Sequence, residues 1–222
     1  MVSTETQSNL RVVAQTAFPQ QTTFARTVKR AFDLLVAVPA LLLLAPLFAL
    51  LALWIKLDSR GPVFFRQERV GAGGRAFRIF KFRTMVVDAE RQGAQLTVGA
   101  DRRITRSGQF LRRSKLDELP QLLNVLASTM TLVGPRPEVP RYVACYSEAQ
   151  RAILQLKPGI TSPASLAFRA ESELLAKQAE PEQFYLAEIM PAKIRTDLDY
   201  AEHATLWSDL RVLAQTALLL FR

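Results

Sequence analysis

Thiol and imidazole side chains are nearly missing from this 222-residue chain, which has one cysteine, Cys145, and one histidine, His203. A single cysteine excludes an internal disulfide. One cysteine with one histidine also argues against a zinc site and against a Cys/His catalytic pair. We therefore expect both residues to be structural.

Acidic side chains are also few relative to basic ones. The chain has 20 Asp and Glu against 29 Lys and Arg, which gives a formal charge of +9 and a pI near 10.2. This balance indicates an anionic partner, and nucleic acid, an acidic membrane surface and a phosphorylated substrate all remain open. The length is sufficient for one domain with a substantial core and for a membrane segment besides.

The first 22 residues are polar, rich in Gln and Thr, and weakly patterned. The basic residues and the first apolar run come too late for a secretory signal, and no small-residue cleavage site follows. We expect residues 1–22 to form a mobile tail.

Charge is absent from the stretch between Leu34 and Ile55. About 20 apolar residues suffice to cross the hydrocarbon core, so we predict a membrane-embedded unit over residues 23–58. Basic residues flank both ends, and the positive-inside rule draws both ends to the cytoplasm. Pro46 lies near the middle and is expected to break the helix. We predict a re-entrant helix that returns to the same face, with a straight span kinked at Pro46 as the alternative.

Residues 63–85 are typical of short strands and turns. The run Gly71–Gly74 separates two apolar segments and indicates a hairpin turn, because no strand–GxGxxG–helix unit surrounds it. Residues 86–110 form a charged connection, which in isolation indicates a solvated surface.

The segment Ser114–Leu126 carries the strongest sign of chemistry. Its leucines recur at helical spacing, and Pro120 is acceptable only in a first turn, so we predict a helix over Leu116–Leu126 with Asp117 near its N-terminus. The unpaired N–H groups there would help keep a carboxylate ionised and ready to act as a nucleophile. The alternative is that Asp117 only caps the helix and Glu118 occupies its first turn.

Cations surround this acidic pair in the sequence. Arg112, Arg113 and Lys115 precede it, and Arg136 follows between two prolines. A guanidinium held in a stiff turn loses little freedom on binding an anion, and its planar fork matches phosphate oxygens. This arrangement favours a phosphate-binding site.

These motifs resemble the bacterial sugar transferases, the monotopic polyprenyl-phosphate phosphoglycosyl transferases. The resemblance covers roughly residues 26–222 and rests on Lys115–Leu126, Leu132–Pro137, Lys29–Asp33, Gly61–Gly71, Phe80–Met85 and Lys157–Thr161. It implies an α+β fold, with an N-terminal re-entrant membrane helix and a compact, mainly helical cytosolic catalytic domain over residues 59–222. That domain would contain short strands and interfacial amphipathic helices. The family breaks its membrane helix at a Ser-Pro pair, whereas this chain has Ala45-Pro46.

The resemblance also implies a reaction. A phosphosugar would pass from a UDP-sugar to polyprenyl (undecaprenyl) phosphate, through a covalent intermediate on Asp117, to begin a bacterial glycoconjugate. Glu118 would hold Mg²⁺ as the cofactor. Phosphate or substrate binding would fall to Lys81, Arg83, Arg112, Arg136 and Pro137, with Asp101 and Arg103 as secondary candidates.

The implied location is the bacterial inner membrane, with its lipids as partners and the catalytic domain facing the cytoplasm. A rival interpretation is a membrane-tethered basic module that binds nucleic acid or anionic lipid, although no nucleic-acid motif is present and we expect no nucleic-acid partner. An inactive scaffold is a third interpretation. The sequence leaves the sugar and the oligomeric state open, and a homo-oligomer is one option.

Overall fold

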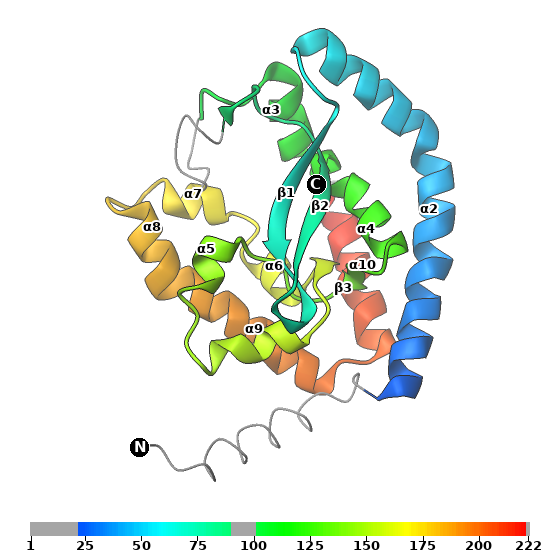
Figure 1. Ribbon diagram of the computed structural model, residues 1–222, viewed down its shortest axis with the longest axis vertical. Helices are drawn as coiled ribbons and strands as arrows, with labels where there is room; N and C mark the ends of the chain where they lie inside the picture. The colour runs from blue at the N-terminus through cyan, green and yellow to red at the C-terminus, as the bar shows by residue number, and fades with distance from the viewer. Residues whose placement is uncertain (1–21, 90–100, 221–222) are drawn as a thin grey trace.

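One long helix, α2 (Thr23–Asp58), runs along one side of a body made of short helices and two small sheets (Figure 1). The computed structural model describes residues 22–89 and 101–220. The predicted tail therefore lies outside the described residues, apart from Thr22, whose side-chain oxygen accepts a hydrogen bond from the Ala25 N–H (3.2 Å) and caps α2. The predicted α+β content is confirmed as a mainly helical fold with a few short strands.

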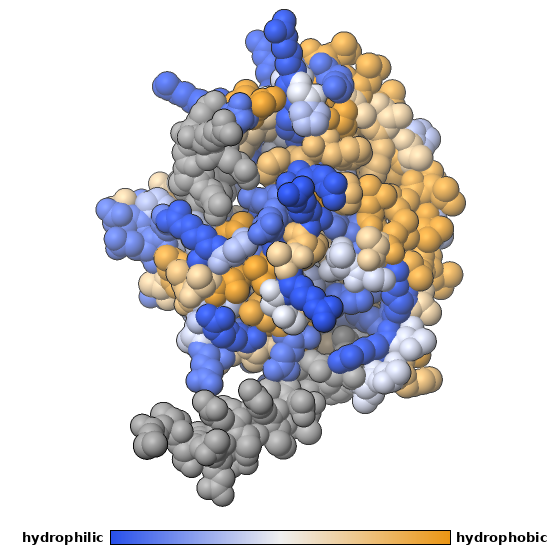
Figure 2. Space-filling model, in the orientation of Figure 1, coloured by the Kyte–Doolittle hydropathy of each residue, from blue (hydrophilic) through white to orange (hydrophobic). Residues whose placement is uncertain are grey.

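Helix α2 is apolar and mostly exposed. Its most apolar 18-residue window has a mean hydropathy of 2.7 and is 11% buried, so by length and composition the helix could cross a membrane. Figure 2 shows the apolar band that it forms on this side of the molecule. Leu35, Leu42 and Leu43 are each more than 70% exposed, while Ala37 and Ile55 are fully buried against the body.

The prediction that Pro46 breaks the helix is wrong. Pro39 and Pro46 both lie inside one helix that continues to Asp58 and curves along its length (Figure 1). Each proline removes one backbone hydrogen bond, and a helix can absorb that loss by bending when its remaining bonds persist.

The predicted hairpin is confirmed. Strand β1 (Phe64–Val70) pairs antiparallel with β2 (Ala76–Phe82), in a register that sets Phe64 opposite Phe82 and Val70 opposite Ala76. The turn between them contains the 3-10 segment η2 (Ala72–Gly74), in which Gly73 and Gly74 have φ of 68° and 72°. Only glycine adopts such angles without steric cost, which explains the glycine run.

A second sheet fixes the loop that carries Arg136. Strand β3 (Thr131–Val133) pairs in parallel with β4 (Gly159–Thr161). Directly after β3, a Cβ built on Gly159 would lie 2.1 Å from the Gly134 nitrogen, so no side chain fits there. The close approach of these two backbones anchors the segment from Gly134 to Pro137.

The remaining helical elements surround the hairpin and this sheet. They are α3 (Arg106–Arg113), η4 (Leu116–Gln121), α4 (Leu122–Leu126), α5 (Pro140–Val143), η5 (Gln150–Gln155), α6 (Pro163–Ala167), α7 (Glu171–Leu175), α8 (Pro181–Phe184), the π-helix η6 (Tyr185–Ile189), α9 (Met190–His203) and α10 (Leu206–Leu220). Buried Ile79 and Phe82 hold β2 against two separate apolar clusters, one beneath α2 and α4 and the other beneath the end of α2. Strand β2, which carries Lys81, is thereby fixed.

The final helix, α10, is amphipathic. In α10, Val212 is buried and joins the cluster beneath α2, whereas Trp207 and Leu218 are 72% and 67% exposed. The helix thus closes the core with one face and presents large apolar groups on another.

Candidate active site

The acidic pair follows a sharp turn. Helix α3 ends at Arg113 and is followed by Ser114, and Lys115 takes a left-handed conformation with φ of 57°. Such a conformation costs a non-glycine residue about 1–2 kcal/mol. The chain then forms η4, with Asp117 and Glu118 in its first turn.

The single α-helix predicted over Leu116–Leu126 is replaced by two shorter elements. A 3-10 segment runs from Leu116 to Gln121, and α4 covers only Leu122–Leu126. Pro120 explains the difference, because it has no N–H for an α-helical bond and its ring opposes the α-helical path of the preceding turn. A six-residue 3-10 turn is too short to supply the strong helix dipole that we expected to act on Asp117.

Asp117 is buried without being neutralised. It is 7% exposed, and its Oδ1 atom has no hydrogen-bond partner in the described part of the chain. Burial, followed by the charge of Glu118, raises the pKa of Asp117 to about 6, while Lys81 and Arg112 act in the opposite direction. Our expectation that the helix terminus would favour ionisation is therefore outweighed by the loss of solvation.

Glu118 has the opposite environment. Its Oε1 atom accepts hydrogen bonds from Lys81 Nζ (2.9 Å) and Arg136 NH2 (2.5 Å), and its Oε2 atom accepts one from Arg136 NH1 (2.9 Å). Burial opposes ionisation, but Arg136 and Lys81 hold the pKa of Glu118 well below its usual range. The two neighbouring carboxyl groups thus differ sharply, because the cations favour the ionised form of Glu118 whereas burial favours the protonated form of Asp117.

Both carboxyl groups line a cavity of about 870 Å³. Among the described residues its lining includes five carboxylate side chains and nine cationic ones, namely Arg69, Lys81, Arg102, Arg103, Arg112, Arg113, Lys115, Arg136 and Lys193. The excess of positive charge suits a ligand with more than one phosphate. The cavity is large enough for a nucleotide-sized molecule, because typical small-molecule pockets measure roughly 300–1,000 Å³.

Most of the predicted site residues meet in this cavity. Lys81, Arg112 and Arg136 line it with the acidic pair, and so do the secondary candidates Asp101 and Arg103. Arg112 Nε donates to Thr84 Oγ1 (2.9 Å), which fixes its guanidinium near the cavity wall. Arg103 is paired with Asp101, to which its Nε and NH2 atoms donate at 3.0 and 2.6 Å. That pairing leaves less of the Arg103 charge for a ligand.

Arg136 is positioned as the sequence predicts, but its partner is a protein group. The proline-flanked guanidinium forms its two-pronged contact with Glu118, and Glu118 raises the pKa of Arg136. Its side chain is 31% exposed. A phosphate entering the cavity would therefore meet a guanidinium that is already oriented.

Two predicted residues do not line the cavity. Arg83 donates from NH1 to the Arg60 carbonyl (2.7 Å) and from NH2 to the Ser59 carbonyl (2.7 Å), so it covers the C-terminal end of α2. This contact fixes the junction between α2 and the body. Pro137 contributes its carbonyl oxygen, which accepts from Arg69 NH1 (3.1 Å).

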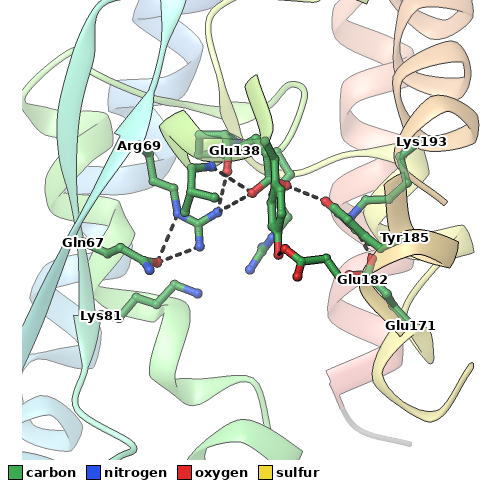
Figure 3. A network of polar contacts seen from close by, with 12 residues as sticks. Gln67, Arg69, Lys81, Glu138, Glu171, Glu182, Tyr185 and Lys193 are labelled. Carbon is green, nitrogen blue, oxygen red and sulfur yellow. Dashed lines mark hydrogen bonds and ion pairs between the residues drawn. The ribbon is translucent and has the colours of Figure 1, made fainter. Parts of the chain in front are cut away.

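A polar network that also lines the cavity was not predicted from the sequence (Figure 3). Arg69 donates to Gln67 Oε1 (2.7 Å from NH2) and to Glu138 Oε1 (3.2 Å), and Tyr185 donates to Glu138 Oε2 (2.5 Å). Nearby, Lys193 Nζ donates to Glu171 Oε2 (2.7 Å). Arg69 belongs to the Gly61–Gly71 motif and Glu138 directly follows the Leu132–Pro137 motif, so both could have been considered, whereas nothing in the C-terminal sequence indicated Tyr185 or Lys193.

The acidic pair has the oxygen ligands that a divalent cation prefers. The described residues contain no group of three or more His, Cys, Asp or Glu that would enclose a metal. Mg²⁺ does not need such a cage, because it keeps several waters and is often bound by one or two carboxylates together with substrate phosphates. The partnerless Oδ1 of Asp117 beside Glu118 fits that pattern, although Glu118 would share its carboxylate with Lys81 and Arg136.

The chain is similar in sequence to known proteins. The family described as "Bacterial sugar transferase" matches residues 24–222. The "UDP-glucose:undecaprenyl-phosphate glucose-1-phosphate transferase" of Xanthomonas campestris pv. campestris is 43% identical over 190 residues, which are 83% of this chain and 37% of that protein. The "Undecaprenyl-phosphate glucose phosphotransferase" of Komagataeibacter xylinus is 40% identical over 195 residues, which are 85% of this chain and 35% of that protein.

A shorter relative matches along most of its length. The "Exopolysaccharide production protein PSS" of Rhizobium leguminosarum bv. phaseoli is 39% identical over 197 residues, which are 85% of this chain and 92% of that protein. By contrast, the chain spans well under half the length of the Xanthomonas and Komagataeibacter proteins.

Proposed function

Because the chain belongs to the bacterial sugar transferase family, we propose that it transfers a sugar 1-phosphate from a UDP-sugar to polyprenyl (undecaprenyl) phosphate and releases UMP. The printed names of the relatives support this substrate pair, since they specify undecaprenyl phosphate and, in the Xanthomonas protein, UDP-glucose. The product would begin a bacterial glycoconjugate, and the name of the Rhizobium protein favours an exopolysaccharide.

One observation carries the proposal. Asp117 is a buried carboxyl group in a cation-lined cavity, its Oδ1 atom has no hydrogen-bond partner among residues 22–89 and 101–220, and the neighbouring Glu118 carboxylate is fully engaged. A structural carboxylate in a protein interior is normally satisfied by hydrogen bonds or ion pairs, because an unsatisfied one is costly. An oxygen kept without a partner is available to attack an electrophile.

The proposed chemistry has two displacements at one phosphorus atom. An Asp117 oxygen attacks the phosphorus that bears the sugar, the bond from that phosphorus to the bridging oxygen breaks, and UMP leaves with the bridging oxygen. An oxygen of the lipid phosphate then attacks the same phosphorus and displaces the carboxylate. The lipid ends as a polyprenyl diphosphate sugar, and Asp117 is regenerated.

The cations have distinct tasks in this scheme. Lys81 and Arg136 hold Glu118 and face the same cavity, so they neutralise charge on the bound diphosphate. Arg112 is fixed by Thr84 and acts electrostatically on Asp117, which places it to favour the ionised nucleophile. Preorganised charge of this kind is the main source of catalysis in phosphoryl transfer.

Mg²⁺ is proposed as the cofactor, held by Glu118 together with waters and substrate phosphates. When bound, it would neutralise charge on the diphosphate. Chelation with EDTA should stop UMP release, and re-added Mg²⁺ should restore it.

Membrane association is supported by α2. Burying one leucine side chain is worth about 1.5–3 kcal/mol, so the exposed leucines of α2 favour a bilayer over water by many kcal/mol in total. Cationic flanks at both ends support a re-entrant arrangement in the bacterial inner membrane, with the body in the cytoplasm. Cysteines placed at Gln21 and Arg60 in a Cys145→Ser background should both be labelled only from the cytoplasmic side. Labelling of either one from the opposite side would indicate a span.

The catalytic proposal is tested by UMP release. Purified protein with Mg²⁺ and polyprenyl phosphate is offered UDP-glucose and UDP-N-acetylgalactosamine separately, and UMP and lipid-linked product are measured together. Equimolar appearance of both products with one of the sugars supports the proposal. Salt-sensitive binding of nucleic acid without turnover of any UDP-sugar would instead favour the basic binding module.

A further inference from the structure

A second cavity lies at the beginning of α2, away from the acidic pair. Its volume is about 350 Å³, and it shares no lining residue with the larger cavity. It lies among the first turns of α2, the loop after β3, the residues before β4, and the end of α9, and its polar lining residues include Arg26, Lys29, Arg30, Lys157, Asp33 and Asp197. Gly134 and Pro135 line this cavity while Arg136 lines the other, so one loop separates the two.

Three of the four cations, Arg26, Lys29 and Arg30, already have partners. Arg30 donates to the carbonyls of Val125 (2.5 Å) and Leu126 (2.9 Å), which closes the end of α4. Lys29 Nζ lies 2.8 Å from Asp209 Oδ2 and 3.5 Å from Asp33 Oδ1. These two side chains are therefore part of the fold and shape the cavity.

Lys157 is different. Its ammonium makes no hydrogen bond or ion pair with residues 22–89 or 101–220, although it lies in the field of Arg30, Lys29 and Arg26. Partial burial and the charge of Arg30 lower the pKa of Lys157, and the charge of Asp33 opposes this shift without touching the ammonium. Cations that repel one another at a cavity without a matching anion are stabilised when an anion binds among them. Lys157 precedes the Pro-Gly-Ile-Thr motif, for which the proposed catalytic site gives no role.

The carboxylates that line this cavity accept hydrogen bonds from other residues. Asp33 accepts from Thr131 Oγ1 (2.6 Å) and from the Leu132 N–H (3.2 Å), and Asp197 accepts from the Ala164 N–H (3.0 Å). They do not neutralise Lys157 by direct contact. Lys157 is thus the one lining cation that has no partner in direct contact within the described part of the chain.

The surroundings indicate what kind of anion fits. The remaining lining is largely apolar and includes Val133, Pro135, Leu156 and Ala201. The exposed leucines of α2 begin only a few residues beyond Arg30, at Leu35. A ligand in this cavity would place its charge among the cations and its apolar part beside α2. An amphiphile fits these surroundings better than a free ion does.

We propose that this second cavity binds the phosphate headgroup of an anionic phospholipid, with Lys157 as its principal contact. The site does not depend on the proposed catalytic reaction, because none of its residues lines the catalytic cavity. Its role would be to fix the start of α2 at the membrane surface.

The test uses the full chain in a neutral detergent. Dioctanoyl phosphatidylglycerol, dioctanoyl phosphatidylcholine and inorganic phosphate are titrated separately, and native mass spectrometry counts the molecules bound. The protein should retain one phosphatidylglycerol in preference to phosphatidylcholine. A cation near an anionic lipid surface contributes about a fivefold gain in affinity, so Lys157→Gln should weaken phosphatidylglycerol binding about fivefold and Lys157→Glu more strongly.

Matched controls separate this site from a general effect of charge. Lys157→Arg should keep most of the affinity, and Lys56→Gln, which removes one exposed charge at the other end of α2, should change it less than twofold. The proposal is overturned if phosphatidylcholine binds equally well, if Lys56→Gln weakens binding as much as Lys157→Gln, or if inorganic phosphate binds at the Lys157-dependent site and phosphatidylglycerol does not. Thermal unfolding of each variant shows whether the fold is intact.

Discussion

Two buried acidic clusters differ in how their negative charge is compensated. One, the acidic cluster beneath α2, consists of Asp33, Asp209 and Lys29, and the other is the Asp117–Glu118 pair in the cavity. Beneath α2, Asp33 accepts hydrogen bonds from Thr131 and Leu132, and Asp209 accepts one from Tyr200 (2.6 Å), with Lys29 placed between the two carboxylates. The Lys29–Asp209 contact is an ion pair without hydrogen-bond alignment, but it still matches charge with charge. In the cavity, Asp117 has neither kind of partner at its Oδ1 atom within the described residues.

The difference separates a carboxylate that stabilises a fold from one that is available for chemistry. The cluster beneath α2 ties the first turns of the long helix to β3 and α10, and both of its carboxylates are nearly inaccessible. Asp117 lies at a cavity wall with its charge opposed by burial and by Glu118. A carboxyl group that lowers the free energy of unfolding and that a ligand can reach is a candidate for function.

The largest expected effect comes from Asp117→Asn, which keeps the size of the side chain and removes its nucleophilic charge. We expect UMP release to fall by about 10³-fold or more. Normal turnover by this variant would show that the partnerless oxygen has no catalytic role.

Asp117→Asn should also stabilise the fold, unlike a substitution in the acidic cluster beneath α2. A pKa of about 6, raised from 3.8, means that the folded state holds its proton more tightly, so the free energy of unfolding falls as pH rises from about 4 to 6. Above pH 6 the penalty is fully present, and it amounts to about 1–3 kcal/mol. At pH 7.5, Asp117→Asn should therefore unfold at a higher temperature than the wild type. The opposite result would mean that the Asp117 charge is compensated.

The next effect concerns Arg136, whose fork holds Glu118. Arg136→Lys keeps the charge but loses the two-pronged contact, and we expect turnover to fall about 10- to 100-fold. The matched control is Arg113→Lys, at a cavity residue with no hydrogen bond to the acidic pair, and it should lower turnover less than threefold. Equal losses in both variants would indicate a requirement for charge in general and not for the fork.

The pH dependence gives a smaller and graded effect. Because Asp117 must be ionised to attack, the rate of the first displacement should be flat above about pH 6 and fall about tenfold for each further unit below it. Single-turnover UMP release between pH 4.5 and 8 measures this limb. A rate independent of pH over that range would show that no group with this pKa controls the step.

The smallest effect on turnover is expected from the cluster beneath α2. Asp33→Asn should destabilise the fold by about 1–3 kcal/mol, because it removes a buried charge beside Lys29 and disturbs two hydrogen bonds. Turnover per folded molecule should change less than twofold. Denaturant unfolding together with activity at a permissive temperature tests both statements, and a large loss of turnover in fully folded protein would contradict the division between the clusters.

Structural features that depend on local sequence could be predicted. The glycine run predicted the hairpin, the uncharged stretch predicted α2, and the cations that flank the acidic pair supply four of the nine cationic residues in the cavity wall. The partner of Arg136 and the role of Arg83 could not be obtained in this way, because each depends on which distant backbone or carboxylate the fold brings within reach. Tyr185 and Lys193 were missed for the same reason, since only tertiary packing brings the C-terminal helices to the cavity.

The most direct measurement is the intact mass of the protein after mixing with Mg²⁺ and the active UDP-sugar in the absence of polyprenyl phosphate. The account predicts about one equivalent of UMP, a mass gain equal to one sugar phosphate that peptide mapping assigns to Asp117, and loss of that mass when the lipid phosphate is added. The Asp117→Asn variant should gain no mass. If an active preparation forms no adduct and releases UMP only when the lipid is present, transfer is direct and Asp117 is not the nucleophile.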